Sequence, residues 1–435
     1  MNIFYRLALY LVLISVIHTA NAGEGMEARV GTGISLAEVT RVVLENNPVI
    51  RQALKKWNAA RARVTQEGAW DDLRVSGTSR AARFVDVAPN AFTDQMVSVE
   101  QAIPITGKNL ARARIARAEA AATFEIARRA QLDVLAKARA SYFRLANAQA
   151  QLELNRRNLV SLRQIAEVSR SRYEVGHGTA GEALASEVEA SRLLESEQDI
   201  LRNISVEQSQ LNVLMNRDAF APLGPAQEQA VKAFELSLDQ IRARMELSRP
   251  EIKIAEANMK MERSRLDLSR RNWIPDPSVT VQAQRYNGAA QAASEVDAGL
   301  SFTVPWVNPG KYSAAVREAK ENMAAAQYAL DRANAESIGA LRDALQKVHT
   351  DRHHAELFRE TLIPQARQAF EANQFSYETG KATFLEWITA QRNLRDLEAM
   401  GQQHVADYRV ALAELEAVVG ADLDLFPSIN KKEPK

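Results

Sequence analysis

Residues 173–182 read Tyr-Glu-Val-Gly-His-Gly-Thr-Ala-Gly-Glu, and residues 377–386 read Tyr-Glu-Thr-Gly-Lys-Ala-Thr-Phe-Leu-Glu. The first glycine of each stretch suits the left-handed residue that ends a helix. The Thr-x-x-Glu sequence that follows is a capping box, which starts a new helix. Each stretch therefore predicts the tip of a helical hairpin. The positions that match include Tyr173, Gly176, Thr179 and Glu182 in the first stretch and Tyr377, Gly380, Thr383 and Glu386 in the second.

The similarity between the two halves of the chain extends beyond these tips. Leu36 and Pro48 recur as Leu238 and Pro250 at one constant offset. Such self-similarity indicates an internal repeat, in which each half has a helix, two strands, a very long helix, a tip and a return helix. The predicted organisation is a signal peptide at 1–22, a first repeat at 23–216, a linker at 217–240, a second repeat at 241–420 and a polar C-terminal tail at 421–435.

The N-terminus reads as a secretory leader. Arg6 precedes the apolar run Leu7–Ile17, and Ala20-Asn21-Ala22 provides a small-residue cleavage site. The alternative is a membrane anchor, but the run is too short to cross the ~30 Å hydrocarbon core of a bilayer. The chain is therefore expected to leave the cytoplasm.

The composition argues against several classes of protein. The formal net charge of the 435 residues is +1, so a nucleic-acid partner is not expected. The chain has no cysteine, which rules out disulfides and thiolate metal sites. Catalytic motifs such as G-x-S-x-G and H-E-x-x-H are absent from the sequence. We therefore expect neither an enzyme nor a bound cofactor.

Long stretches of the chain have helical patterns. Residues 35–69 predict one helix, and residues 107–173 predict a continuous helix of roughly 100 Å at 1.5 Å per residue. Apolar residues recur every seven positions from 138 to 173, which suits coiled-coil packing. In the second half, Pro364 is expected to kink the long helix, because proline removes a backbone donor and clashes with the preceding turn.

Four short segments, at 74–82, 95–103, 279–284 and 295–304, alternate apolar with polar residues. This period predicts strands with one apolar face, and their lengths suit the strands of outer-membrane barrels. Four strands cannot close a barrel, and an open edge in lipid leaves backbone groups unsatisfied. The chain is therefore expected to associate, as a dimer with eight strands or a trimer with twelve. A four-stranded soluble sheet beside a coiled coil is the alternative.

Several motifs accompany the two tips: Asn47-Pro48, the junction Gln101-Ala-Ile-Pro-Ile-Thr-Gly-Lys108, the following Arg112–Glu119, and the strand entry Pro275-Asp-Pro277. Through them, over about residues 34–420, the chain resembles the TolC family of outer-membrane efflux channels. The Gly-Lys junction and the Pro-Asp-Pro entry are most similar to the heavy-metal branch of that family, the CzcC-like channels.

The resemblance implies a mainly α-helical homotrimer in the outer membrane of a Gram-negative bacterium, extending into the periplasm. Twelve strands would form one membrane β-barrel, and twelve long helices would form an α-barrel tunnel. A periplasmic adaptor protein and an inner-membrane pump would be its partners, together with outer-membrane lipid. The tunnel would conduct substrate passively, with heavy-metal cations expected. Export of drugs or other organic solutes is one alternative, and a periplasmic coiled-coil scaffold or adaptor without a pore is another.

By the same resemblance, the two tips would dock the adaptor and close an iris. Glu182 and Glu386 have two readings, as capping carboxylates or as a ring of acids that faces the pore and attracts cations. The chain departs from the family pattern at Ala185 and Thr389, where a second acid is missing, and at Ala382, where an arginine is missing. A different network is therefore expected to hold the resting iris.

His349 and His353 are the only metal-site candidates. They are four residues apart on one helix face, a spacing that can ligate a metal ion. Two solvated histidines on a polar face are the favoured interpretation, so no metal site is assigned.

Overall fold

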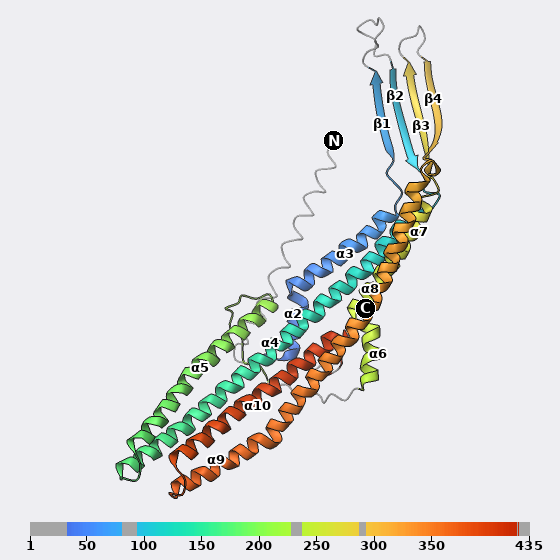
Figure 1. The fold of residues 1–435 in the computed structure, drawn as a ribbon. Helices are drawn as coiled ribbons and strands as arrows, with labels where there is room; N and C mark the ends of the chain where they lie inside the picture. The colour runs from blue at the N-terminus through green and yellow to red at the C-terminus, as the bar shows by residue number, and fades with distance from the viewer. Residues whose placement is uncertain (1–32, 81–93, 228–236, 287–292, 424, 426–435) are drawn as a thin grey trace, which may run out of the picture. The chain divides into compact units, whose positions relative to one another are not determined.

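The computed structural model describes residues 33–80, 94–227, 237–286, 293–423 and 425 (Figure 1). The predicted signal peptide lies outside these ranges. The chain divides into two compact units. Unit 1 comprises the residues up to Ile50, Gln131–Met245 and the residues from Ala340 onward, and unit 2 comprises Arg51–Ala130 and Glu246–Gly339.

Helices dominate the described residues, as the sequence predicts (Figure 1). The α-helices are α2 (Leu36–Asn46), α3 (Pro48–Gly68), α4 (Lys108–Glu174), α5 (Ala180–Leu214), α6 (Leu238–Ser248), α7 (Pro250–Arg271), α8 (Pro309–Leu357), α9 (Ile363–Glu378) and α10 (Phe384–Val419). A 3₁₀ turn, η1 (Pro305–Val307), precedes α8, and a π-helical turn, η2 (Phe358–Leu362), joins α8 to α9. Every helix within the described ranges lacks the long apolar stretch that a membrane crossing requires.

The strands of unit 2 form one antiparallel sheet in the order β1 (Arg74–Arg80), β2 (Asp94–Ala102), β3 (Pro277–Tyr286), β4 (Ala293–Phe302). All four predicted strands are present with bounds that differ by at most two residues, and residues 81 and 82 of the first predicted segment lie outside the described residues. In the register, Val281 of β3 lies opposite Val99 on one side and Ala298 on the other. The strands also carry exposed apolar side chains, among them Val75, Val97, Val281, Val296 and Leu300. Within the described residues, β1 and β4 are edge strands, each with a single neighbour.

The prediction of one helix over residues 35–69 was wrong, because the chain breaks at Asn47. The residue before a proline disfavours helical backbone, and Asn47 is extended, with φ −61° and ψ 126°. Its side-chain oxygen accepts the amide of Val49 at 2.9 Å, and its side-chain nitrogen donates to the carbonyl of Leu214 at 2.8 Å. Within unit 1, Asn47 therefore caps the first turn of α3 and also bonds to the end of α5.

One carboxylate in unit 2 joins the turn before α4 to the entry of β3. Asp276, from the Pro-Asp-Pro entry to β3, accepts the backbone amide of Thr106 at 3.0 Å and its hydroxyl at 2.6 Å. Lys108 lies 3.1 Å from the other carboxylate oxygen of Asp276. Burial raises the pKa of Asp276, but the hydrogen bonds from Thr106 and Lys108 outweigh it and hold that pKa below its ordinary value. Two motifs from opposite halves of the sequence thus form one contact.

The first and last described segments of the chain pack in unit 1, together with the described start of the linker. Ile34 pairs with Ala226 of the predicted linker, and the hydroxyl of Tyr142 lies 2.7 Å from the carbonyl oxygen of Gln227. Leu423 and Leu425 are buried, although they belong to the segment predicted as a polar tail. The packed part of the chain therefore extends past residue 421.

The region before Pro364 has a local change of helix geometry. The π-helical turn η2 ends at Leu362, and α9 begins with Pro364 in its first turn. Gly401 of α10 lies against this turn, since a Cβ at Gly401 would lie 2.8 Å from Cδ1 of Ile363. The extra residue in a π turn accommodates the missing proline donor. The structure therefore has a π turn directly before Pro364, where the sequence predicts a kink.

Candidate functional site at the hairpin tips

Both predicted hairpin tips are present in unit 1, between α4 and α5 and between α9 and α10 (Figure 1). Gly176 has φ +78° and Gly380 has φ +75°, the left-handed conformation that the sequence predicts. The amide of His177 donates to the carbonyl of Arg172 at 2.8 Å, and the amide of Lys381 donates to that of Ser376 at 2.7 Å. These bonds close each helix with a Schellman-type end.

The two helix starts are not equivalent. Thr383 and Glu386 form a complete capping box: the Thr383 hydroxyl accepts the Glu386 amide at 3.3 Å, and the Glu386 carboxylate accepts the Thr383 amide at 2.7 Å. These bonds lower the pKa of Glu386. Thr179 accepts the Glu182 amide at 3.3 Å, but the Glu182 carboxylate instead accepts the hydroxyl of Tyr377 at 2.8 Å. The prediction of a reciprocal capping box was therefore wrong at the first tip.

Tyr377 is the contact point between the two hairpins. Its side chain is buried, and its ring stacks on Trp387 at a centroid distance of 4.9 Å. The guanidinium of Arg172 lies 4.6 Å from the ring centre and donates to the Tyr377 carbonyl at 3.1 Å. Burial, together with the Glu182 carboxylate, raises the pKa of the Tyr377 hydroxyl. Tyr173, its counterpart in the first tip, is half-exposed.

An apolar core lies behind these contacts and includes both hairpins. α4 and α5 contribute leucines and an isoleucine, and the second tip contributes its aromatic residues. The members are Leu159, Leu162, Ile165, Leu193, Tyr377, Phe384, Trp387 and Ile388. Burial of such side chains contributes about 1.5–3 kcal/mol each, so this core is the main attraction between the hairpin ends.

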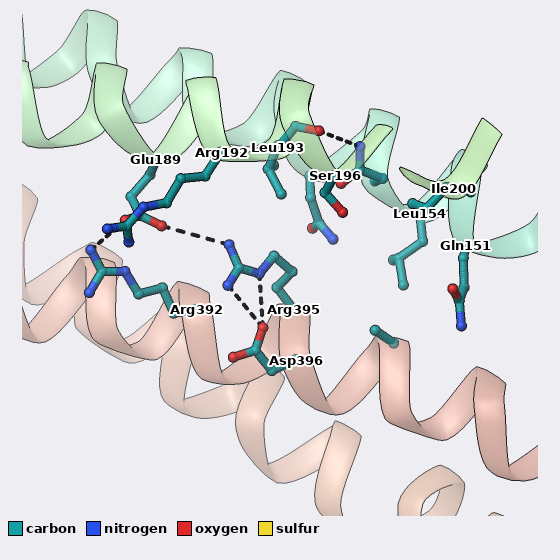
Figure 2. Close-up of a pocket in the computed structure, with 13 residues that line it drawn as sticks. Gln151, Leu154, Glu189, Arg192, Leu193, Ser196, Ile200, Arg392, Arg395 and Asp396 are labelled. Atoms are coloured by element: carbon teal, nitrogen blue, oxygen red, sulfur yellow. Dashed lines mark hydrogen bonds and ion pairs between the residues drawn. The ribbon is translucent and has the colours of Figure 1, made fainter. Parts of the chain in front are cut away.

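A buried carboxylate, which the sequence analysis did not identify, forms a second polar contact between the hairpins. Glu189 of α5 accepts Arg192 and Arg392 at 2.7 Å each, and its other oxygen lies 3.7 Å from Arg395 (Figure 2). Arg395 also pairs with Asp396 at 2.9 Å. The only signal in the sequence was the spacing, since Glu189 follows Glu182 by two helical turns and so lies on the same face.

These side chains line a cavity of about 370 Å³ between α4, α5 and α10 (Figure 2). Its polar lining includes Asn155 and Asn158 of α4, and its apolar lining includes Leu154, Leu193 and Ile200. The Asn155 side-chain amide donates to the carbonyl of Leu193 at 2.9 Å. The cavity thus lies where the two hairpins meet, beside Glu189.

The structure does not bring His349 and His353 together with further ligands. Both side chains are exposed on α8. The rings of His354 and of His404 in α10 lie closer together, at a centroid distance of 5.0 Å, than those of His353 and His354, at 6.2 Å. In the part of the chain that the structure describes, no three histidine or acidic side chains gather in an arrangement that could hold a metal ion.

The sequence matches the family described as "Outer membrane efflux protein" over residues 39–216 and 227–421, which is most of the chain. The chain belongs to this family. It is accordingly an outer-membrane protein of a family of efflux channels, which are not enzymes.

One curated relative is the cobalt-zinc-cadmium resistance protein CzcC of Cupriavidus metallidurans. It is 29% identical over 199 residues, which cover 44% of this chain. The match spans 43% of that relative, less than half of its length.

Solved structures share the fold over nearly the whole chain. A membrane protein from Pseudomonas aeruginosa has a TM-score of 0.77 at 20% identity, with 88% of this chain and 93% of that chain covered. CusC, whose structures are described as showing transmembrane channel formation, has a TM-score of 0.78 at 16% identity, with 89% and 92% covered. The long helical hairpins and the four-stranded sheet are therefore the fold of this group of channels.

Proposed function

We propose that this chain is the outer-membrane conduit of a three-part export system, in which an inner-membrane pump supplies the energy and a periplasmic adaptor docks at the hairpin tips. The observation that carries the proposal is the open four-stranded sheet with exposed apolar side chains such as Val281 and Leu300. In lipid, unpaired edges leave backbone groups unsatisfied. Three copies would complete a closed barrel of twelve strands.

Exposed apolar side chains on the helices support the same association. Leu184 and Val188 of α5 are more than half exposed, while their polar neighbour Glu189 is buried. A helix that exposes its apolar residues in a single chain has a surface that another chain can cover. In a trimer, α5 would use this face against the next subunit.

The direct test of the conduit is conductance in a planar lipid bilayer. Purified full-length protein is expected to insert and give discrete ion-conducting steps. Removal of one edge strand, β4, is expected to abolish the steps, because the barrel could not close. A protein that associates with lipid but never conducts would contradict the proposal and favour a scaffold without a pore.

The exported substrate is proposed to be a heavy-metal cation. The support is the similarity to CzcC, which is described as a cobalt-zinc-cadmium resistance protein. A strain that lacks this protein is expected to become sensitive to divalent metals and to recover when the gene is restored. Sensitivity to organic toxicants without any change in metal tolerance would overturn this assignment and favour export of organic solutes.

The closed state of the mouth is proposed to depend on contacts between the hairpins. Glu182 and Tyr377 join the tips, and Glu189 with Arg392 joins the hairpins two turns further from the tip. This second contact would replace the ion pair of the family's arginine, which is missing here because position 382 is alanine. In this account Glu386, whose carboxylate is held in the capping box, is the acid available at the second tip to face passing cations.

A further inference from the structure

The cavity beside Glu189 has the charge and the donors of an anion site. Its lining contains the arginines Arg192, Arg392 and Arg395, against the carboxylates Glu189 and Asp396. Each carboxylate is already engaged by guanidinium groups. The side chain of Glu189 is only 3% exposed, so it is not available to a further cation. Positive charge therefore remains at the cavity surface.

Two donors at this cavity lack an acceptor within the described residues. They are Nε of Arg392 and the side-chain nitrogen of Asn158, and both atoms are buried. A buried donor without a partner costs free energy, and native structures usually satisfy such groups with protein, water or ligand. Both residues line the cavity. A hydrogen-bond acceptor bound in the cavity would therefore lie next to both residues.

The arginines differ in how deeply they lie. The side chain of Arg395 is 22% exposed and that of Arg392 is 39% exposed, whereas Arg192 is 63% exposed. Arg192 therefore stands at the rim, and Arg395 lies deeper. A cavity of about 370 Å³ has room for a small ion with several waters, since one water takes roughly 30 Å³ in the liquid.

We propose that this cavity binds a small oxyanion of the phosphate or carboxylate type, between α5 of one hairpin and α10 of the other. The planar guanidinium presents paired donors that match carboxylate and phosphate oxygens. A bound oxyanion would accept from Arg192 and Arg395 and would supply the missing acceptor for Asn158. It would also link the two hairpins at the height of Glu189.

The test is calorimetric titration of the purified full-length protein in non-ionic detergent with inorganic phosphate and, separately, with succinate. Chloride at matched ionic strength serves as the reference. Saturable binding of phosphate or succinate above the chloride reference is the expected result. Which of the two binds more tightly assigns the oxyanion class.

Variants place the binding in the cavity. Arg192→Gln and Arg395→Gln are each expected to weaken binding by about tenfold, which corresponds to the loss of one charge-assisted contact. Glu189→Gln keeps the arginines and removes the competing charge, so it is expected to tighten binding. Arg156→Gln is the matched control, because Arg156 is an exposed arginine of α4 that pairs with Glu197 and does not line the cavity.

The arginine variants are expected to weaken anion binding and Glu189→Gln to tighten it. If an arginine variant fails to fold, the result for Glu189→Gln still tests the proposal. No saturable heat with either anion would overturn the proposal. Binding that Glu189→Gln leaves unchanged or weakens would also overturn it. The measurement does not depend on ion conduction, so its failure would leave the proposed conduit function untouched.

Discussion

The hydroxyl of Tyr377 donates a 2.8 Å hydrogen bond to the carboxylate of Glu182, although the two residues are 195 positions apart in the sequence. Tyr377 belongs to the second tip and Glu182 to the first. The bond uses the carboxylate that would otherwise complete the capping box of α5. One helix start is therefore less completely capped, and the two hairpin tips are joined.

Tyr377→Phe should weaken this joint and leave the ring stacking on Trp387 in place. The expected loss is about 1.5–3 kcal/mol, the range for a hydrogen bond to a charged group, and is seen as a lower thermal midpoint. In a planar bilayer, the resting conductance of the variant should rise, because the tips separate more easily. Tyr173→Phe is the matched control, since Tyr173 is half-exposed. Equal conductance in the two variants would remove Tyr377 from the closing contact.

The hydroxyl of Tyr377 also predicts that the hairpin tips lose stability at alkaline pH. Burial raises the pKa of Tyr377 in the folded protein above its ordinary value of 10.0. Its contribution to stability is therefore fully present below pH 10 and is lost as the pH rises through the raised pKa. The wild-type tip should loosen in that range, and the thermal midpoint of Tyr377→Phe should fall less steeply there. Parallel decreases would contradict this explanation.

The tip glycines could be predicted from the sequence, because only a left-handed residue ends a helix in that way. The inequality of the two caps could not, since Thr179 and Thr383 stand in the same Thr-x-x-Glu pattern. What differs is the position of Tyr377 in space, which depends on the packing of two hairpins. Local sequence determines the turn, and tertiary contact determines the carboxylate's partner.

Glu189 shows a second limit of the sequence. The apolar pattern of α5 predicts that Leu184 and Val188 are buried against neighbouring helices. Both side chains are instead more than half exposed, and Glu189 is buried. A carboxylate is buried only when partners compensate its charge. Two of the partners of Glu189, Arg392 and Arg395, come from the other half of the chain. The exposed leucine and valine are explained if another subunit covers them.

Thr383→Ala should destabilise the start of α10 more than Thr179→Ala destabilises the start of α5. The hydroxyls of Thr179 and Thr383 each accept the amide three residues later at 3.3 Å, and the Thr383 hydroxyl in addition donates to the Glu386 carboxylate at 2.9 Å. The loss of an N-cap side chain costs about 1 kcal/mol. Hydrogen exchange at the amide of Glu386 should accelerate by several-fold in Thr383→Ala. If the amide of Glu182 accelerates equally in Thr179→Ala, the two caps are energetically equivalent and the asymmetry has no consequence.

Asp276→Asn should loosen the junction between β3 and α4. Asp276 accepts two bonds from Thr106 and pairs with Lys108, and loss of a bond to a charged group costs about 1.5–3 kcal/mol. Because its folded pKa is lowered, this contribution is present above the ordinary pKa of 3.8 and is lost as the pH falls through the lowered value. Acid unfolding curves should therefore show a smaller low-pH decrease for Asp276→Asn. An identical decrease in the wild type would exclude Asp276 from the acid response.

The buried pair of Arg139 and Glu416 in unit 1 predicts a larger loss of stability than the hydrogen bonds above. The side chain of Arg139 is 15% exposed and that of Glu416 is 5% exposed. Removal of one partner of such a buried pair lowers the free energy of unfolding by about 3–5 kcal/mol. Arg139→Met should therefore lower the thermal midpoint strongly. Burial already raises the pKa of Glu416, so the variant should recover part of its stability as the pH falls and the carboxyl is protonated.

The double variant Arg139→Met with Glu416→Leu is the control for this pair. It removes both charges and should be clearly more stable than Arg139→Met alone, because no buried carboxylate is left unpaired. A double variant as unstable as the single one would show that Arg139 acts through packing and not through the charge of Glu416.

In the proposed conduit, three copies of the four-stranded sheet close one barrel in the membrane. The most direct measurement is the mass of the detergent-solubilised, full-length protein by native mass spectrometry. The account predicts a particle of three chains that loses its quaternary structure when the detergent is removed. A water-soluble particle of one chain that keeps its fold without detergent would contradict it.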